Sequence, residues 1–429
     1  MQAIVVTFDR LATRLVGCYG NEWVETPNFD RLAATATVFD NHFADSVGPK
    51  SCRAWVTGHH AMSSSVETLT PPLGHWLNEA GVSSRLIVTD NSALALFESA
   101  GFDPALLATR HSPLASSSTP FDRVIHVAGT DGLEVEPGDV PFAKLVQAAG
   151  ALLRDPEFSA DKRLIWLHAP EPGLPPEGFA TLYAEDFEER GFPLTEVPRE
   201  DWSRQIAVAA GSMSLVDHWL GELLSQINAT RQDQPTLILI AAGRGRSWTE
   251  SFFVAAPSAR GDSAADQLRD QETKSPLMLS ILGDDRFAEL SGLRCQRFVQ
   301  SMDVLPTLLD WFGVSIGTEP LEGRSLLREA VSDEPARTEI YFGDDDRNIG
   351  IRTTDWNCLM RLSQLDQPIP IDVCFGDEKW PEQVQLFSKP EDIWDVTDLA
   401  TQQPEVCEEL VRRVGAHRRG EEGTLQIAK

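Results

Sequence analysis

Charged and polar residues follow each of four short apolar runs in the sequence. They are Asp9-Arg10, Thr89 to Asn91, Glu171 to Gly173 and Gly243 to Arg246. In open parallel sheets, binding sites form where loops leave the carboxyl ends of the strands, so these residues would line one pocket. Arginine binds sulfate, phosphate and carboxylate groups through a planar fork of donors. This rim is rich in arginine and poor in paired metal ligands, so anion binding is the chemistry that it favours.

The apolar runs that must position these residues predict strands. They are Ile4 to Phe8, Arg85 to Thr89, Arg163 to Leu167 and Thr236 to Ala242. Runs that are apolar on both faces are typical of a mostly parallel sheet covered by helices on each side. The sequence therefore predicts an α/β fold.

Helices are predicted between the runs from apolar residues at helical spacing. Such stripes extend from Ile206 to Ile227 and from Met302 to Phe312, the second helix ending near Gly313. Asn28 is predicted to cap a helix that continues through Ala36. We interpret residues 104–135 as an irregular insertion.

A polar stretch from Ser332 to Pro335 suggests a domain boundary. We expect an α/β domain at residues 1–330 and a C-terminal α+β subdomain at residues 331–429. The subdomain should hold a small antiparallel sheet and a terminal helix. Its expected strands are Glu339 to Phe342, Ile349 to Thr353 and Cys358 to Leu362, and its expected helix carries Val406, Leu410 and Val414.

The chain is strongly acidic, with 37 lysine and arginine residues against 65 aspartate and glutamate residues and a net charge of −28. This balance argues against nucleic acid or an anionic membrane surface as a general partner. The sequence has neither a basic leader nor an apolar stretch of the ~18 residues that span a bilayer. We therefore expect a cytoplasmic protein. The six cysteines form no CxxC pair or Cys/His cluster, so free thiols are predicted.

Several further motifs are spread along the whole chain. They are Cys18 to Gly20, Thr26 to Ala33, Arg53 with Thr57-Gly58, Asp303 to Asp310, Leu321 to Leu327, Leu386-Phe387, Asp398 to Ala400 and Pro404 to Val406. In type and order they resemble the signatures of sulfatases in the alkaline phosphatase superfamily. The resemblance implies a large mostly parallel mixed sheet sandwiched by helices, with a small C-terminal antiparallel sheet plus a helix.

The resemblance also implies a nucleophile, which this chain lacks. Sulfatases convert the cysteine of a CxPxR motif at a helix N-terminus to formylglycine. Arg53 matches the arginine of that motif, which places Pro49 at the nucleophile position. Proline has no side chain that can attack sulfur. Cys52 is not followed by proline at +2 or arginine at +4, so its conversion to formylglycine is not expected.

The metal ligands of the family are also replaced. Its calcium is held by an Asp-Asp pair after the first strand and by an Asp-His or Asp-Asn pair after a later one. This chain has Asp9-Arg10 at the first position and Gly243-Arg244 at the second. Calcium needs about six or more oxygen ligands. We therefore expect no metal ion and no cofactor.

The groups that transfer protons are missing as well. The family's GKWH stretch corresponds to Val88 to Asn91, and the histidine of its DPHxP turn corresponds to Gly173. We expect His168, at the end of a predicted strand, to be a core histidine. Asp9 and Arg53 are the remnants of the catalytic set. Because cooperating catalytic groups lose most of their rate when one is removed, the sequence predicts an inactive pseudo-sulfatase with no catalytic residues.

Three arginines suggest a function that persists without catalysis. Arg10, Arg53 and Arg244 would converge near the lost metal site and hold a small anionic ligand, such as a sulfated or phosphorylated sugar. In a simpler interpretation, Arg10 and Arg244 only pair with Asp9, Asp90 or Glu171. The scaffold could also serve as a surface for an unidentified protein partner.

An active enzyme remains the alternative. In this hypothesis a non-standard, metal-independent site hydrolyses a sulfuric or phosphoric ester, with Ser46, Ser51 or Cys52 as the nucleophile. Such a nucleophile needs an adjacent base and donors for the developing oxyanion. No motif places a histidine beside any of these residues.

Overall fold

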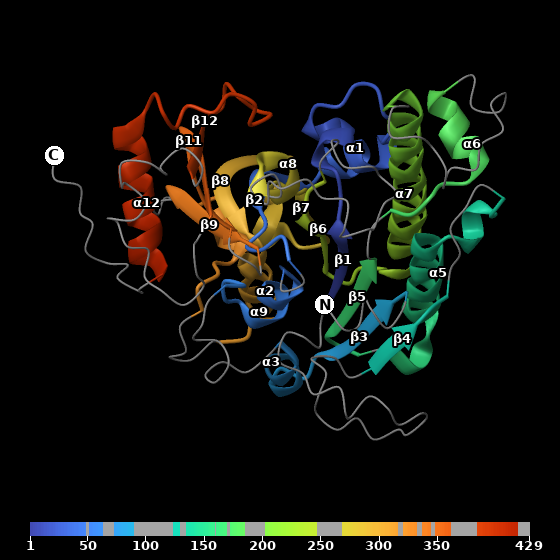
Figure 1. The fold of residues 1–429 in the computed structure, drawn as a ribbon. Helices are drawn as coiled ribbons and strands as arrows, with labels where there is room; N and C mark the ends of the chain where they lie inside the picture. Colours follow the sequence, from blue (N-terminus) through green and yellow to red (C-terminus); the bar gives the residue numbers. More distant parts are fainter. Residues whose placement is uncertain are drawn as a thin grey trace, which may run out of the picture.

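The computed structural model describes most of the chain in thirteen segments. They are residues 1–48, 51–62, 73–89, 123–128, 134–158, 160–169, 172–184, 202–246, 268–315, 321–332, 337–344, 348–361 and 384–418. Two sheets and their covering helices organise these segments (Figure 1).

The larger sheet contains eight strands within the described segments, in the order β4-β3-β5-β1-β6-β7-β2-β8. They are β1 (Gln2–Arg10), β2 (Thr37–Phe43), β3 (Ser83–Val88), β4 (Arg123–His126), β5 (Arg163–Ala169), β6 (Thr236–Arg244), β7 (Leu277–Leu282) and β8 (Arg294–Gln300). Strand β7 is antiparallel to both of its neighbours, and the other pairings are parallel. This mostly parallel mixed sheet confirms the predicted α/β fold, and the four predicted runs form its adjacent strands β3, β5, β1 and β6.

The central strands are buried on both faces, which explains their continuous apolar sequences. In β1, Ala3 and Val5 face one core, whereas Ile4, Val6 and Phe8 face the other. Alternation along a strand sends successive side chains to opposite faces of the sheet. Two hydrophobic cores therefore form, one on each side.

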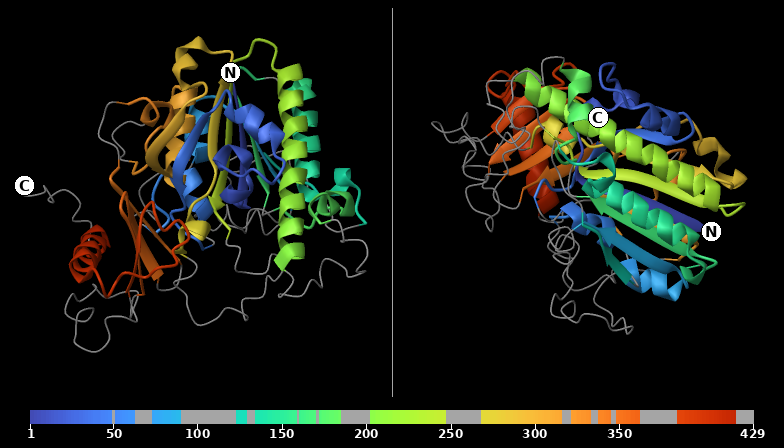
Figure 2. Two further views of the ribbon diagram at one scale, coloured as in Figure 1. Left: turned by 90° about the horizontal axis from the view of Figure 1, so that it is seen from above. Right: turned by 90° about the vertical axis from the view of Figure 1, so that its right-hand side faces the viewer.

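Helices cover both faces of the larger sheet (Figures 1 and 2). The α-helices of the described segments, including α12 of the C-terminal part, are α1 (Pro27–Ala33), α2 (Ser51–Thr57), α3 (Leu73–Glu79), α5 (Pro141–Arg154), α6 (Glu177–Ala180), α7 (Trp202–Thr230), α8 (Asp270–Thr273), α9 (Val304–Phe312), α10 (Leu326–Glu329) and α12 (Pro404–Arg418). Helices α1, α5 and α7 contribute to the core that contains Ile4, and α2, α3, α9 and α10 contribute to the core that contains Val5.

Two helix predictions are confirmed, and the helix predicted from Asn28 through Ala36 is wrong at both ends, because α1 ends at Ala33. The stripe from Ile206 to Ile227 lies in α7, and α9 ends at Gly313, whose φ of 71° is the left-handed conformation that glycine favours. Helix α1 instead begins at Pro27, so Asn28 lies inside it. The carboxylate of Asp217, on α7, accepts hydrogen bonds from the backbone N–H groups of Asn28 and Phe29, at 2.9 and 2.8 Å. A residue distant in the sequence therefore caps this helix.

The predicted irregular insertion at residues 104–135 is wrong for residues 123–126. Residues Arg123–His126 form β4, which pairs in parallel with β3 at the edge of the sheet. A four-residue edge strand has too little apolar sequence to be recognised from its pattern. Residues 104–122 lie outside the described residues.

The smaller sheet is antiparallel, with the strand order β12-β11-β10-β9. Its strands are β9 (Glu339–Gly343), β10 (Asn348–Thr353), β11 (Trp356–Arg361) and β12 (Val384–Ser388). Helix α12 packs on it through Cys407, Leu410 and Val414. The predicted small sheet with a terminal helix is therefore confirmed. Strand β12 was not predicted, and the boundary between residues 330 and 331 stays a prediction.

The five cysteines in the described part of the chain are free thiols, as expected. Cys374 lies outside it. None of the helices in the described segments combines the length and the apolar character needed to cross a membrane.

Candidate functional site

The carboxyl ends of four adjacent strands, β3, β5, β1 and β6, lie side by side at one end of the larger sheet, which we call the carboxyl edge. Arg10 of β1 pairs in register with Arg244 of β6. His168 of β5 pairs with Thr7 of β1 on one side and with Val88 of β3 on the other. The residues that end or follow these strands therefore gather at one edge, as the sequence predicted.

Asp9 and Arg244 form an ion pair at this edge. The Nη2 atom of Arg244 lies 3.1 Å from Oδ2 of Asp9, and both side chains are mostly buried, with exposed fractions of 16% and 18%. Nη1 of Arg244 donates a hydrogen bond to the carbonyl oxygen of Val47. Arg244 is thus held by the strand end on one side and by the segment before α2 on the other.

Gly243 lets the start of α2 approach the sheet. A Cβ atom at Gly243 would lie 3.2 Å from the carbonyl oxygen of Asp9 and 3.3 Å from Oγ of Ser51. Both distances are tighter than ordinary contact. Where the family resemblance implies a metal-ligating side chain, this chain therefore has a glycine against which Ser51 packs.

His168 is a core histidine, as predicted. Its side chain is fully buried, and its Nδ1 atom lies 3.0 Å from Oγ1 of Thr7. Nε1 of Trp166 donates to the same Thr7 oxygen at 2.8 Å. The ring of Trp55, from α2, packs edge-on against His168 with a centroid distance of 5.8 Å. This cluster packs α2 against strands β1 and β5.

Arg10 and Arg53 are half-buried and remain outside the Asp9–Arg244 pair. Within the described segments, neither guanidinium forms an ion pair or a side-chain hydrogen bond. Arg10 continues the row of Ile4, Val6 and Phe8, so its Cβ lies on the face that α5 and α7 cover, opposite to α2. The structure brings Arg244 to Asp9, but it shows no contact that joins all three arginines.

Several buried donors at this edge have no hydrogen-bond partner among the described residues. They are Oγ of Ser51, Nε of Arg53, Oγ1 of Thr89 and Nε of Arg244. Each can donate a hydrogen bond, and a buried donor without a partner costs about 1–3 kcal/mol. A group that supplies acceptor oxygens would offset this cost. Sulfate and phosphate are such groups.

The side chains around Asp9 do not supply the oxygen ligands that a calcium ion needs. Oδ2 of Asp9 already accepts a hydrogen bond from Arg244, and Gly243 supplies no side-chain oxygen. Among the described residues, no three histidine, cysteine, aspartate or glutamate side chains gather in a way that could hold a metal ion. Calcium prefers about six to eight oxygen ligands, so a guanidinium beside the carboxylate is a poor substitute for that shell.

The alternative nucleophiles differ in their environments. Oγ of Ser46 accepts a hydrogen bond from the N–H of Gly48 at 3.0 Å. Cys52 is fully buried, and this burial raises the pKa of its thiol well above the ordinary value, so the reactive thiolate is disfavoured. Ser51 is also fully buried, but it faces the strand ends.

Of the other residues singled out from the sequence, one is described in the structure and four are not. The carbonyl oxygen of Gly173 accepts a hydrogen bond from Oγ of Ser212 at 2.8 Å, which ties this turn to α7. Pro49, Asp90, Asn91 and Glu171 lie outside the described residues.

Comparisons with known proteins agree with the motifs. The family model described as Sulfatase matches residues 2–314. The multifunctional alkaline phosphatase superfamily protein PehA of Trinickia caryophylli is 27% identical over 147 residues, which is 33% of this chain and 26% of that protein. Iduronate 2-sulfatase of Mus musculus is 23% identical over 382 residues, which is 75% of this chain and 66% of that protein. The matches thus span about a quarter and just under two thirds of these relatives.

Among solved structures, a phosphonate monoester hydrolase of Agrobacterium radiobacter has a similar fold. Its TM-score is 0.71 at 16% sequence identity, and the match covers 98% of this chain and 95% of that one. At this identity the likeness concerns the fold alone. The family model covers most of the chain, and it shows that this chain belongs to the sulfatase family.

Proposed function

We propose that this sulfatase-family protein is a pseudo-sulfatase, which binds a small anionic ligand without a metal ion and without hydrolysing it. The ion pair between Asp9 and Arg244 is the observation that carries this proposal. A cation on a side chain takes the place beside Asp9 that a metal ion has in the resembled sulfatases. Arginine stays protonated at all ordinary pH values, so its charge is permanent.

Buried donors without partners on α2 and at the carboxyl ends of the strands support a site for an anion. Arg53 brings a guanidinium without a carboxylate partner, and Ser51 and Thr89 add hydroxyl groups without acceptors among the described residues. Charge-assisted hydrogen bonds from such groups to a sulfate or phosphate are among the stronger polar contacts in proteins. Arg10 is the remaining candidate for this site.

The relatives suggest the class of ligand. Two similar proteins are named as an iduronate 2-sulfatase and a phosphonate monoester hydrolase, names that refer to sulfate and phosphonate chemistry. A sulfated or phosphorylated sugar is therefore the ligand class that we propose for this chain. The net charge of −28 disfavours long polyanions, so we propose a small molecule.

Isothermal titration calorimetry with sulfated and phosphorylated monosaccharides at millimolar concentration tests binding. Wild type should bind at least one of them, and Arg53→Met should weaken this binding at least tenfold. Arg286→Met is a matched control, because Arg286 is 71% exposed and pairs with Asp284 instead. No heat with any of these sugars would overturn the proposed function.

A second candidate function is hydrolysis with Ser51 as the nucleophile. One observation favours it: the buried Oγ of Ser51 has no partner among the described residues and lies beside the position of Gly243, at the strand ends. A serine hydroxyl is a weak nucleophile without a base. The hydrogen bonds of the described residues do not link a histidine to Ser51, which is why we place binding without turnover first.

Turnover of an aryl sulfate and an aryl phosphate separates the two functions. A pseudo-sulfatase releases phenol no faster than buffer alone. Turnover that is lost in Ser51→Ala and kept in Cys52→Ala would instead establish the hydrolase. This comparison is valid only for variants that keep the wild-type melting temperature, because Ser51 and Cys52 are both buried.

A further inference from the structure

Large apolar side chains are exposed in three separate parts of the described chain. Trp23 precedes α1, Leu182 follows α6, and Ile393, Trp394 and Val396 lie in the turn after β12. Their exposed fractions range from 41% to 72%. Single exposed apolar residues are common on protein surfaces, whereas a contiguous patch of them marks an interaction site.

Arg14 joins the turn after β12 to the segment before α1. Its guanidinium lies 4.0 Å from the centre of the Trp394 ring, and its Nη2 donates to the carbonyl oxygen of Ile393 at 2.7 Å. Nδ2 of Asn21 donates to the carbonyl oxygen of Arg14 at 2.6 Å. Oδ1 of the same asparagine accepts a hydrogen bond from the N–H of Trp23 at 2.9 Å. A continuous series of contacts therefore leads from one tryptophan to the other.

Trp23 also contacts the segment after α6. Its ring packs edge-on against that of Tyr183, with a centroid distance of 5.0 Å. The hydroxyl of Tyr183 accepts a hydrogen bond from the N–H of Glu25 at 2.9 Å and shares another with Oγ of Ser214 at 2.6 Å. Leu182 directly precedes this tyrosine. The three parts thus form one surface, which we call the tryptophan patch and define by Arg14, Trp23, Leu182, Ile393, Trp394 and Val396.

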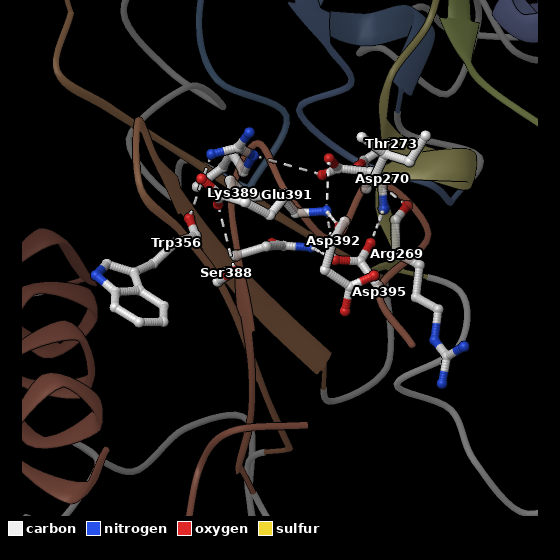
Figure 3. Close-up of polar contacts among 12 residues, drawn as sticks. Arg269, Asp270, Thr273, Trp356, Ser388, Lys389, Glu391, Asp392 and Asp395 are labelled. Carbon is white, nitrogen blue, oxygen red and sulfur yellow. Dashed lines mark hydrogen bonds and ion pairs between the residues drawn. The ribbon is translucent and has the colours of Figure 1, made fainter. Parts of the chain in front are cut away.

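Buried polar contacts fix the turn that exposes Trp394 and Val396. The side chain of Asp395 between them is fully buried, with Oδ1 2.7 Å from Nζ of Lys389, and Figure 3 shows it turned toward Lys389 and Asp270. Oδ2 of Asp392 accepts a hydrogen bond from the N–H of Val396 at 2.9 Å. Because Asp395 points into the protein, its two neighbours point out of it. A surface that is held in this way loses little conformational entropy on binding.

The rim of the tryptophan patch is acidic. Within two positions along the chain of its exposed apolar residues, the sequence has no lysine or arginine. It has six carboxylates there, of which Asp395 is paired with the buried Lys389. The other five are Glu22, Glu25, Glu391, Asp392 and Asp398. Arg14 is the cation that the contacts above bring to the patch, so carboxylates outnumber it five to one.

This charge selects among the classes of partner. An acidic rim on a chain of net charge −28 repels sulfated sugars, nucleic acids and anionic membranes, and it attracts a basic partner. An apolar centre with a polar rim is the usual anatomy of a protein–protein interface. Tryptophan and arginine are also enriched among the residues that contribute most to protein binding.

We propose that the tryptophan patch is a docking surface for another protein, which binds through an amphipathic helix with a basic polar face. The apolar face of that helix would cover Trp394 and Val396, and its lysine or arginine side chains would lie against Glu22 and Glu391. The proposal does not depend on the anion site at the carboxyl edge.

A synthetic peptide tests this surface on the full chain. The peptide has about 14 residues, or about four helical turns, with leucine at helical spacing and lysine at the other positions. A matched peptide carries glutamate in place of each lysine. Fluorescence anisotropy of the end-labelled peptides at physiological ionic strength gives the dissociation constants. The lysine peptide should bind, and the glutamate peptide should not.

Substitutions in the patch show where the lysine peptide binds. Trp394→Ser and Val396→Ser should each weaken binding about tenfold. Val396→Ser leaves the contact between Arg14 and Trp394 in place. Val331→Ser is the matched control, because Val331 is also an exposed apolar residue, at 39%, but follows α10 outside the patch. Since the changed side chains are exposed, all three variants should keep the wild-type melting temperature.

Charge substitutions separate the acidic rim from the net charge. Glu22→Gln/Glu391→Gln should weaken binding of the lysine peptide about fivefold, because two exposed ion pairs are lost. Asp285→Asn/Glu289→Gln removes the same charge from exposed residues that follow β7, at the opposite end of the sheet from the carboxyl edge. This control should bind the peptide as tightly as wild type.

Equal affinity of wild type, Trp394→Ser and Val396→Ser for the lysine peptide would overturn the docking surface. Equal binding of the glutamate peptide would overturn the basic partner. Sedimentation velocity of the protein alone addresses a second copy of this chain as the occupant. We expect no dimer that depends on the patch, and a dimer that disappears in Val396→Ser would assign the patch to self-association and refute the proposal.

Discussion

Arg244 and Asp9 come from adjacent central strands and form an ion pair, with Nη2 of the arginine 3.1 Å from Oδ2 of the aspartate. The pair lies at the edge of the sheet where strands β3, β5, β1 and β6 all end. Because Arg244 also donates to the carbonyl of Val47, it joins the sheet to the segment that leads into α2. The arginine is therefore part of the framework of the site.

Replacing Arg244 with methionine should destabilise the protein by about 2 kcal/mol, between the values typical of exposed and fully buried pairs. The change leaves the mostly buried carboxylate of Asp9 and the carbonyl of Val47 without their donor. Urea denaturation measures the free energy of unfolding. The double variant Asp9→Asn/Arg244→Met should regain part of the loss, because its amide carries no charge. An unchanged midpoint in Arg244→Met would show that the pair contributes nothing to stability.

Calcium should have no effect on this protein. A metal ion bound at 100 times its dissociation constant raises stability by about 2.7 kcal/mol, which shifts the melting temperature by several degrees. Because Arg244 occupies the carboxylate of Asp9, we expect the same melting temperature in millimolar calcium and in excess EDTA. Differential scanning calorimetry gives the answer. Stabilisation by calcium that disappears in Asp9→Asn would refute the metal-free site.

The strands that carry the site could be predicted from the sequence because they are buried on both faces. A central parallel strand such as β1 is apolar on both faces over most of its length, and this signal is strong in a single sequence. Because the carboxyl ends of parallel strands lie on the same side of a sheet, the predicted strands also placed Asp9 and Arg244 together. The edge strand β4 gave no such signal, because it is short and begins and ends with Arg123 and His126.

Contacts between residues far apart in the sequence could not be predicted. Asp217 caps α1 from 189 positions away, and Thr13 contacts Lys274 from 261 positions away. Neither partner carries a motif, and only the packing of α7 and α8 brings these groups together. The convergence of Arg10, Arg53 and Arg244 stays a prediction. Strand alternation places the Cβ of Arg10 on the face opposite to α2.

His42 should make the stability of the protein sensitive to acid. The side chain is fully buried in β2, and this burial lowers its pKa from 6.5 to about 4. Between these values the unfolded chain is protonated at this histidine and the folded chain is not, so stability is lost as the pH falls. In His42→Gln this contribution is absent. The stability difference between wild type and variant should therefore change by about 1 kcal/mol between about pH 6 and pH 5, in favour of the variant at the lower pH.

Urea denaturation of both proteins at the two pH values measures this difference directly. The comparison cancels the contributions of the carboxylates, such as buried Asp45, which titrate equally in both proteins. Because Nδ1 of His42 lies 3.0 Å from Oγ of Ser275, the variant should be less stable than wild type near neutral pH. A difference that is the same at both pH values would mean that His42 titrates alike in the folded and unfolded chains.

Gly245 should be required for the close contact between β6 and α8. A Cβ atom at this position would overlap the backbone carbonyl oxygens of Gln271 and Lys274, which cannot move independently of α8. Gly245→Ala should therefore destabilise the protein by about 1–3 kcal/mol. Gly178→Ala is the matched control, because a Cβ there meets nothing within 4 Å and the residue is exposed on α6. That change should be neutral or stabilise the protein by up to about 1 kcal/mol, since alanine restricts the unfolded chain. Thermal unfolding of both variants distinguishes these effects, and equal melting temperatures would show that α8 yields to the added methyl group at no cost.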